Sequence, residues 1–165
     1  MQVVNYLRCN WHNVVFIFIA ILTVFADQVS KTWIRANLLY GHSLFNIEFF
    51  RITHAQNTGA AFGLFQGQSF ILTIIALAGV VAVLLFVLFS HRYLPSLDNM
   101  VGKSVLGLVL GGIVGNLIDR LRFGYITDFI DFSFWPAFNI ADSAITVSVV
   151  IFAYLLIRQT VDEKR

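Results

Sequence analysis

Twenty consecutive uncharged residues, Phe70–Phe89, constrain the fold of this chain more than any other stretch. An apolar segment of roughly 20 residues is what an α-helix needs to cross a bilayer. The composition agrees, because 58% of the residues are hydrophobic and only 12% are charged, against about 25% charged in soluble domains. We therefore predict an integral membrane protein.

Three further apolar stretches complete the predicted membrane region. The first continues as a helical pattern through Asp27 and Lys31 with no small-x-small cleavage site, so we read it as a retained helix and not a signal peptide. Residues 90–99 are read as a polar loop between the second and third helices, with Pro95 as the helix breaker. Without repeats or linkers, we expect one domain over residues 1–165. The predicted membrane helices lie at about 14–34, 70–89, 104–121 and 141–157.

The segment between the first two helices, residues 36–68, has strand and turn character. The side chains of residues 43–49 alternate between apolar and other residues, as those of a half-buried strand do. Residues 51–54 are read as a continuation of this strand, after the alternation shifts by one residue at Phe49 and Phe50. Residues 122–141 are read as a loop. The predicted fold is a mainly α membrane protein with four transmembrane helices, a small extracytoplasmic β-sheet and a periplasmic-side loop.

Four spans place both termini on one side of the membrane. Cytoplasmic loops carry an excess of Lys and Arg, and six basic residues lie on the side of the termini against five on the other. Some of those five are expected to be held in ion pairs, Asp27 with Lys31 and Asp119 with Arg120. The remaining bias favours cytoplasmic termini, which places the predicted sheet on the outer face.

The third predicted helix carries two stripes of residues at four-residue spacing. One stripe is Gly107, Gly111 and Gly115, and the other is Gly112, Asn116 and Arg120. Small residues at this spacing let a second membrane helix approach closely. The stripes therefore indicate a packed interface that carries polar groups into protein and not into lipid.

Several kinds of chemistry are unsupported by the sequence. There is no H-E-x-x-H zinc motif, and the four histidines are scattered. There is no G-x-S-x-G nucleophile elbow. A net charge of +2 without a basic, aromatic-rich patch gives no sign of nucleic-acid binding. We expect neither a metal nor another cofactor.

Acidic residues at the edge of the membrane region are the remaining chemical feature, because ionisable groups there are costly and usually functional. Asp142 lies near the amino end of the fourth helix, where the helix dipole favours the ionised form. Asp128 lies among aromatics, where desolvation raises a carboxyl pKa. Two such carboxyls can share one proton and activate water for amide hydrolysis. Asp131 is the competing candidate, and Asp119 is read as a structural partner for a nearby cation.

Five ordered motifs resemble those of the bacterial lipoprotein signal peptidases, also called signal peptidase II. They are Asp27 with Lys31, Asn57-Thr-Gly-Ala-Ala-Phe, Gly115-Asn-Leu-Ile-Asp-Arg120, Asp128-Phe-Ile-Asp-Phe and Phe138-Asn-Ile-Ala-Asp-Ser143. The match spans almost the whole chain in order. The resemblance implies an aspartyl endopeptidase of the bacterial inner membrane, which removes the signal peptide of a prolipoprotein just before its lipid-modified cysteine.

The resemblance also implies roles for individual residues. Asp128 and Asp142 would be the catalytic pair, and Asp27 and Lys31 would support the site from the first helix. The implied partners are prolipoproteins and membrane lipids, and we expect a monomer. The residues implied to line or brace the substrate pocket are Asn57, Gly59, Asn116, Arg120, Asn139 and Ala141.

Two readings from other classes stay open at this level. Intramembrane acids can mark a proton- or cation-coupled transporter, although these acids cluster at one membrane face and no inverted repeat is visible. A scaffold that binds partner helices through its glycines would explain Gly107, Gly111 and Gly115 but not the carboxylates. Asp27 and Lys31 could likewise form only a structural ion pair at the membrane boundary.

Overall fold

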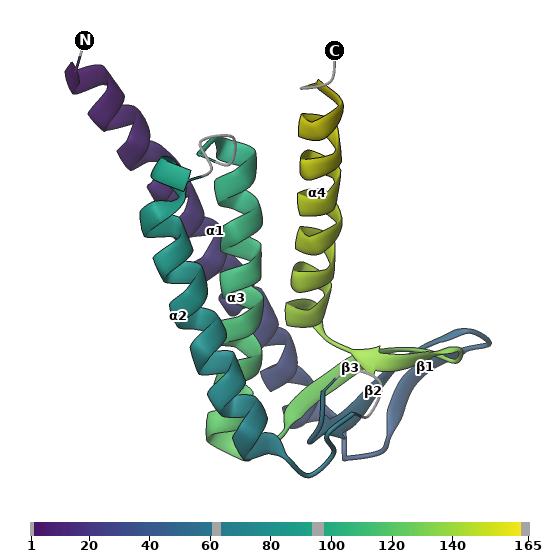
Figure 1. Cartoon of the computed structure of the whole chain (residues 1–165). Helices are drawn as coiled ribbons and strands as arrows, with labels where there is room; N and C mark the ends of the chain where they lie inside the picture. The colour runs from purple at the N-terminus through teal and green to yellow at the C-terminus, as the bar shows by residue number, and fades with distance from the viewer. Residues whose placement is uncertain (1, 61–63, 94–97, 163–165) are drawn as a thin grey trace.

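The computed structural model describes residues 2–60, 64–93 and 98–162. Figure 1 shows the helices standing side by side, with a sheet across one end and the start of α1 and the end of α4 at the other. The elements in chain order are α1 (Gln2–Asn37), β1 (Ser43–Ile47), β2 (Phe50–Asn57), α2 (Ser69–Tyr93), α3 (Met100–Phe123), β3 (Ile126–Phe132), β4 (Trp135–Phe138) and α4 (Ile140–Asp162).

Within the described part of the chain, four helices are long and apolar enough to cross a bilayer, which confirms the predicted membrane fold. They contain the candidate spans Trp11–Asn37, Ser69–Phe89, Met100–Phe123 and Ile140–Arg158. Each helix is longer than its predicted span. Residues 90–93, expected in a polar loop, are the last turn of α2, while Pro95 lies outside the described residues. Asn99 caps α3 by accepting from the Gly102 amide at 2.9 Å.

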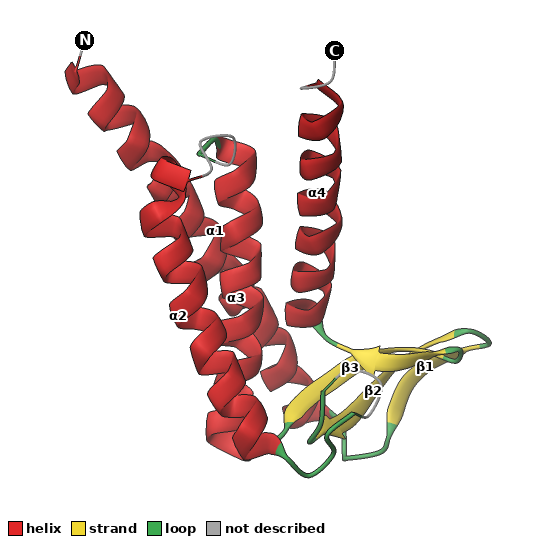
Figure 2. Cartoon of the chain, in the orientation of Figure 1, coloured by secondary structure: helices red, strands yellow, loops and turns green. Residues whose placement is uncertain are grey.

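The strands form one antiparallel sheet in the order β1-β2-β3-β4 (Figure 2). The prediction that residues 51–54 continue the strand of residues 43–49 was wrong, because the chain reverses at residues 48–49 and the two segments form a hairpin. The prediction of a loop at residues 122–141 was also wrong, since this segment contains β3 and β4. Phe50 of β2 pairs with Phe132 of β3. This pairing with a distant part of the chain makes the segment around Asp128 a strand and not a loop.

Helix α3 lies against both α1 and α4, and its glycines bring it close to each. A Cβ on Gly107 would lie 2.7 Å from the carbonyl oxygen of Phe16 in α1. A Cβ on Gly112 would lie 2.6 Å from the carbonyl oxygen of Ala141 in α4. The stripe of Gly107 and the stripe of Gly112 therefore serve two different helix contacts, and both contacts depend on the missing side chain.

A small apolar core joins the sheet to the end of α1. Ile34 of α1, Leu38 just after α1 and Phe129 of β3 are buried together. Helix α3 ends beside this core, where Gly124 adopts a left-handed conformation (φ 78°) and donates its amide to Arg120 at 3.0 Å. These contacts fix β3 against the helices and so determine where its side chains point.

Candidate active site

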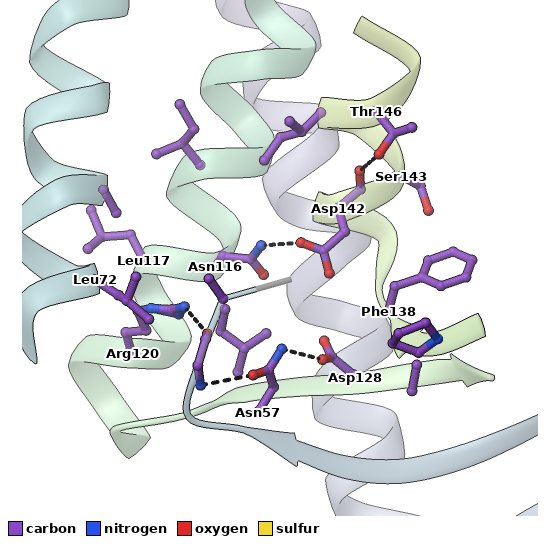
Figure 3. A pocket seen from close by; sticks show the side chains of 18 of the residues that line it. Asn57, Leu72, Asn116, Leu117, Arg120, Asp128, Phe138, Asp142, Ser143 and Thr146 are labelled. Carbon is purple, nitrogen blue, oxygen red and sulfur yellow. Dashed lines mark hydrogen bonds between the residues drawn. The ribbon is translucent and has the colours of Figure 1, made fainter. Parts of the chain in front are cut away.

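Asp128 and Asp142 face one cavity at the end of the helix bundle that carries the sheet (Figure 3). Asp128 comes from the middle of β3, and Asp142 comes from the first turn of α4. The cavity has a volume of about 1000 Å³. The prediction placed Asp128 in a loop, whereas the structure holds it in a paired strand, opposite Ala55 of β2.

Asn139 binds both carboxylates. Its side-chain amide donates to Asp128 Oδ1 at 2.7 Å, and its backbone amide donates to Asp142 Oδ2 at 3.3 Å. In return, the Asp142 amide donates to Asn139 Oδ1 at 2.9 Å. This reciprocal exchange is a capping box at the start of α4. One residue thus begins the helix and sets the position of the two acids relative to each other.

Each carboxylate accepts a second amide from another element. Asn57, the last residue of β2, donates to Asp128 Oδ2 at 3.1 Å. Asn116 of α3 donates to Asp142 Oδ1 at 2.7 Å. The Asn57 side chain is held in turn by the Gly59 amide, which donates to its Oδ1 at 2.9 Å. Every carboxylate oxygen therefore has one fixed donor, with further lone-pair capacity for a ligand.

The predicted Asp27–Lys31 pair is present and lies directly behind the two acids. Lys31 Nζ is 2.8 Å from Asp27 Oδ2 and donates to Asn116 Oδ1 at 2.8 Å. Asp27 Oδ1 accepts from the Ala141 amide at 3.0 Å. Lys31 and Asp27 are both fully buried. The pair therefore orients the Asn116 amide from α1 and holds the first turn of α4.

Arg120 lies at the edge of the cavity and is not paired with Asp119, so that predicted ion pair was wrong. Neighbouring residues on a helix point in different directions and do not face each other. Arg120 donates from Nη2 to the Gly59 carbonyl at 2.6 Å, and its buried Nη1 has no hydrogen-bond partner within the described ranges. Asp119 instead lies 3.6 Å from Lys31 and 3.2 Å from Arg35, as expected for a structural acid.

Asp131, the competing candidate, lies outside the cavity. It pairs with Arg51 across β2 and β3, at 2.6 Å from carboxylate oxygen to Nε. The Arg51 side chain is 44% exposed and the Asp131 side chain 13%, so this is a partly buried ion pair on the sheet. The structure brings Asp128 together with Asp142, and it keeps Asp131 away from both.

The electrostatics of the cavity favour one proton on the pair of acids. Burial raises the pKa of Asp128 to about 7, and the nearby Asp142 carboxyl adds to the rise. Hydrogen bonds from Asn57 and Asn139 and the positive charge of Lys31 oppose it. A carboxyl that stays protonated to near neutral pH beside a second carboxyl can act as an acid while its neighbour acts as a base.

The rest of the cavity is mostly apolar and is formed by three membrane helices. From α2, α3 and α4 it takes Leu72, Ile75, Ala76, Ile113, Leu117, Ile145 and Val147. From the sheet and its connections it takes Gln56, Ala60, Trp135 and Phe138. A ligand with a long apolar segment and a polar end matches this division.

Two residues that hold the site were missed in the sequence. Arg35 of α1 donates from Nη1 to Thr127 Oγ1 of β3 at 2.8 Å, across 92 positions of the chain. Arg35 continues the four-residue spacing of Asp27 and Lys31, so the helix face could have identified it. Nothing local could have identified Thr127, because its partner is distant in sequence.

Comparisons with known proteins agree on one family. A family model described as "Signal peptidase (SPase) II" matches residues 19–158. A lipoprotein signal peptidase of Dehalococcoides mccartyi is 48% identical, over 77% of this chain and 79% of the relative. One from Moorella thermoacetica is 43% identical, over 86% and 92%. A solved bacterial membrane enzyme, determined by the in meso method at 2.3 Å resolution, matches with a TM-score of 0.78 and 33% identity, over 88% of each chain.

Proposed function

The chain belongs to the signal peptidase II family, and from this premise we propose that Asp128 and Asp142 catalyse cleavage on the amino side of a diacylglyceryl-modified cysteine. Membership makes it an aspartic-type membrane peptidase that acts on prolipoproteins. The observation that carries the proposed mechanism is Asn139, which binds a carboxylate from β3 and another from α4 at one end of an apolar cavity. Such a cavity suits a signal helix whose cleavage site lies at the membrane surface.

In the proposed reaction, a water molecule lies between the two carboxyls. Asp142 takes a proton from the water, whose oxygen attacks the scissile carbonyl carbon, and Asp128 gives its proton to the carbonyl oxygen. The tetrahedral intermediate then collapses. Asp142 passes its proton to the leaving nitrogen of the lipid-modified cysteine, and Asp128 recovers one from the intermediate. The raised pKa of Asp128 supports its role as the first acid.

The surrounding polar groups are proposed to bind the extended substrate backbone near the scissile bond. Arg120 is the clearest case, because its buried Nη1 has no hydrogen-bond partner among the described residues and a substrate carbonyl could supply one. The carbonyl oxygen of Gly59 accepts a hydrogen bond from Nη2 of the same guanidinium and so helps to hold it in place. Asn57, Asn116, Asn139 and Ala141 would act through the carboxylates and the α4 turn that they hold. Since one chain forms the whole cavity, we propose a monomer.

The proposed orientation has cytoplasmic termini and the carboxylates at the outer face of the inner membrane. Four of the five basic residues on the sheet side are engaged by protein groups, namely Lys31, Arg35, Arg51 and Arg120. This supports discounting them in the charge comparison. Two reporters fused after the C-terminus test this orientation. A reporter that works only in the cytoplasm should be active, and activity of a reporter that works only in the periplasm would refute the orientation.

The test of function is cleavage of purified prolipoprotein. The protein should cleave the diacylglyceryl-modified form and leave the unmodified form intact. Asp128→Asn and Asp142→Asn should each lose at least about 10³-fold in kcat, since a carboxyl of the pair is replaced by a neutral amide. Asp131→Asn is the matched control and should retain activity. Near-parent cleavage by folded Asp128→Asn or Asp142→Asn would show that the assigned pair is wrong.

A further inference from the structure

Arg35 is a partly buried cation of α1 that lies outside the cavity. Its side chain is 15% exposed, and its guanidinium lies over the Phe123 ring at 4.5 Å from the centroid. It donates from Nη1 to Asp119 at 3.2 Å and to the Thr127 hydroxyl at 2.8 Å. A single side chain therefore joins α1 to α3 and to β3.

Thr127 is held at its hydroxyl, at its backbone amide and at its carbonyl oxygen, which accepts from Asn139 Nδ2 at 3.5 Å. Its hydroxyl accepts from Arg35, and its backbone amide donates to Asp119 Oδ2 at 2.9 Å. Thr127 and Asp119 are completely buried. The next residue is Asp128, and successive side chains on a strand point to opposite faces. Fixing Thr127 on the helix side of β3 thus fixes the direction in which Asp128 enters the cavity.

Arg35 also affects the second acid through the charge balance behind the site. The buried Asp27 and Asp119 carboxylates face two cations, Lys31 and Arg35. With Arg35 present, Lys31 Nζ lies closer to Asp27, at 2.8 Å, than to Asp119, at 3.6 Å. The same ammonium reaches Asn116 Oδ1 at 2.8 Å. Without Arg35, Asp119 would draw Lys31 away from Asn116.

We propose that Arg35 is a positioning residue for the catalytic pair, acting through Thr127 on Asp128 and through Asp119 and Lys31 on Asn116. The inference rests on the proposed function, because it concerns the same two carboxylates. Neither Arg35 nor Thr127 lines the cavity. Their loss should therefore reduce turnover and leave substrate binding nearly unchanged.

The test measures kcat and KM for cleavage of diacylglyceryl-modified prolipoprotein by the full chain. Thr127→Val, which removes the hydroxyl at constant shape, should lower kcat about tenfold with KM within about twofold, because a small misplacement of a reacting group is costly. Thr127→Ser should restore kcat. The matched control is Thr53→Val, which removes a buried strand hydroxyl that donates to His42 at 3.2 Å, away from the site. It should keep the parent kcat.

A double-variant experiment tests whether Arg35 acts through Thr127. Arg35→Gln should lower kcat at least as much as Thr127→Val, and adding Thr127→Val to Arg35→Gln should change it by less than about twofold, since coupled residues are not additive. Arg51→Gln removes the matched arginine of the Arg51–Asp131 pair and should be neutral. Independent, multiplicative losses would overturn the proposed route.

The remaining outcomes are also decisive. If Arg35→Gln does not fold, Thr127→Val and Thr127→Ser decide the question alone. Parent-like kcat in Thr127→Val, or a loss that Thr127→Ser does not restore, would overturn the inference. Asp128→Asn is measured alongside. If Asp128→Asn is inactive and Thr127→Val is parent-like, only the role of Arg35 fails; if Asp128→Asn is active, the proposed function itself fails.

Discussion

The substitution Gly112→Ala tests how closely α3 and α4 must approach for the two acids to work together. A Cβ at residue 112 would lie 2.6 Å from the carbonyl oxygen of Ala141 and 2.6 Å from a side-chain carbon of Ile145. The carbonyl belongs to the first turn of α4 and cannot rotate away as a side chain can. That turn also carries Asp142, so relief of the clash displaces a proposed catalytic group.

The size of the effect follows from this contact. Ordinary van der Waals contact begins at 3.4 Å, so the 2.6 Å approach must open by about 0.8 Å. A misplacement of about 1 Å can cost roughly 10²-fold in rate. We therefore expect kcat to fall roughly 30- to 100-fold in Gly112→Ala. Overpacking of this kind should also cost about 1–3 kcal/mol of stability.

Gly107→Ala is the matched control. Its Cβ would lie 2.7 Å from the carbonyl oxygen of Phe16, so it makes a similar clash in the same helix, but against α1 and far from the acids. The stability loss should be similar, while kcat should stay within about threefold of the parent. The assay combines kcat for prolipoprotein cleavage with thermal unfolding of both variants in detergent.

The two variants separate positioning from general destabilisation. A parent-like kcat in folded Gly112→Ala would show that the α3–α4 distance does not determine the alignment of Asp142 and Asp128. Equal kcat losses in Gly112→Ala and Gly107→Ala would attribute the effect to stability alone. Either result would refute the reasoning.

Three further outcomes are expected. Lys31→Met should lower the free energy of unfolding by about 3–5 kcal/mol, because it leaves the buried Asp27 and Asp119 carboxylates without their shared cation. Chemical unfolding in detergent measures this free energy, and a loss below about 1 kcal/mol would contradict the prediction. The pKa of Asp128 is raised to about 7, so its proton is present below that pH and lost above it; kcat/KM should fall as pH rises through about 7, and a flat profile would count against Asp128 as the acid. Gly59→Ala would place a Cβ 2.6 Å from the Leu64 carbonyl oxygen, so the loop that holds the Arg120 guanidinium must move. KM should rise severalfold, as measured by cleavage rates over a range of substrate concentrations.

The parts of the site that could be predicted are those with a helical spacing. Asp27 and Lys31 lie four residues apart and pair as expected. The two stripes of α3 predicted close packing, and the structure shows that Gly107 and Gly112, one from each stripe, contact different helices. Asp119 was correctly read as a structural acid, although its partner was wrongly taken to be Arg120. The spacing predicts a shared face but does not identify the residue on the neighbouring element.

The parts that could not be predicted depend on strands that meet from distant parts of the chain. The segment around Asp128 was read as a loop because its pairing partner, β2, lies about 70 residues earlier, as the 71-residue separation of Asn57 and Asp128 shows. Strand propensity depends on cross-strand neighbours more than on local sequence. The hairpin of β1 and β2 is local, and it was missed for another reason: the two-residue turn at residues 48–49 was read as a shift in the alternation of one continuous strand.

The sequence by itself determined the four helices that, among the described residues, are long and apolar enough to cross a membrane, because a helix satisfies its own backbone hydrogen bonds and its apolar length is a local property. It also narrowed the chemistry to a few aspartates. Only the tertiary structure decided which of them meet. Asp128 and Asp142 converge because Asn139 caps α4 while its side chain reaches β3, and Asp131 is excluded because sheet register pairs it with Arg51. Capping and register across separate elements are non-local, so they emerge only when the helices and the sheet pack together.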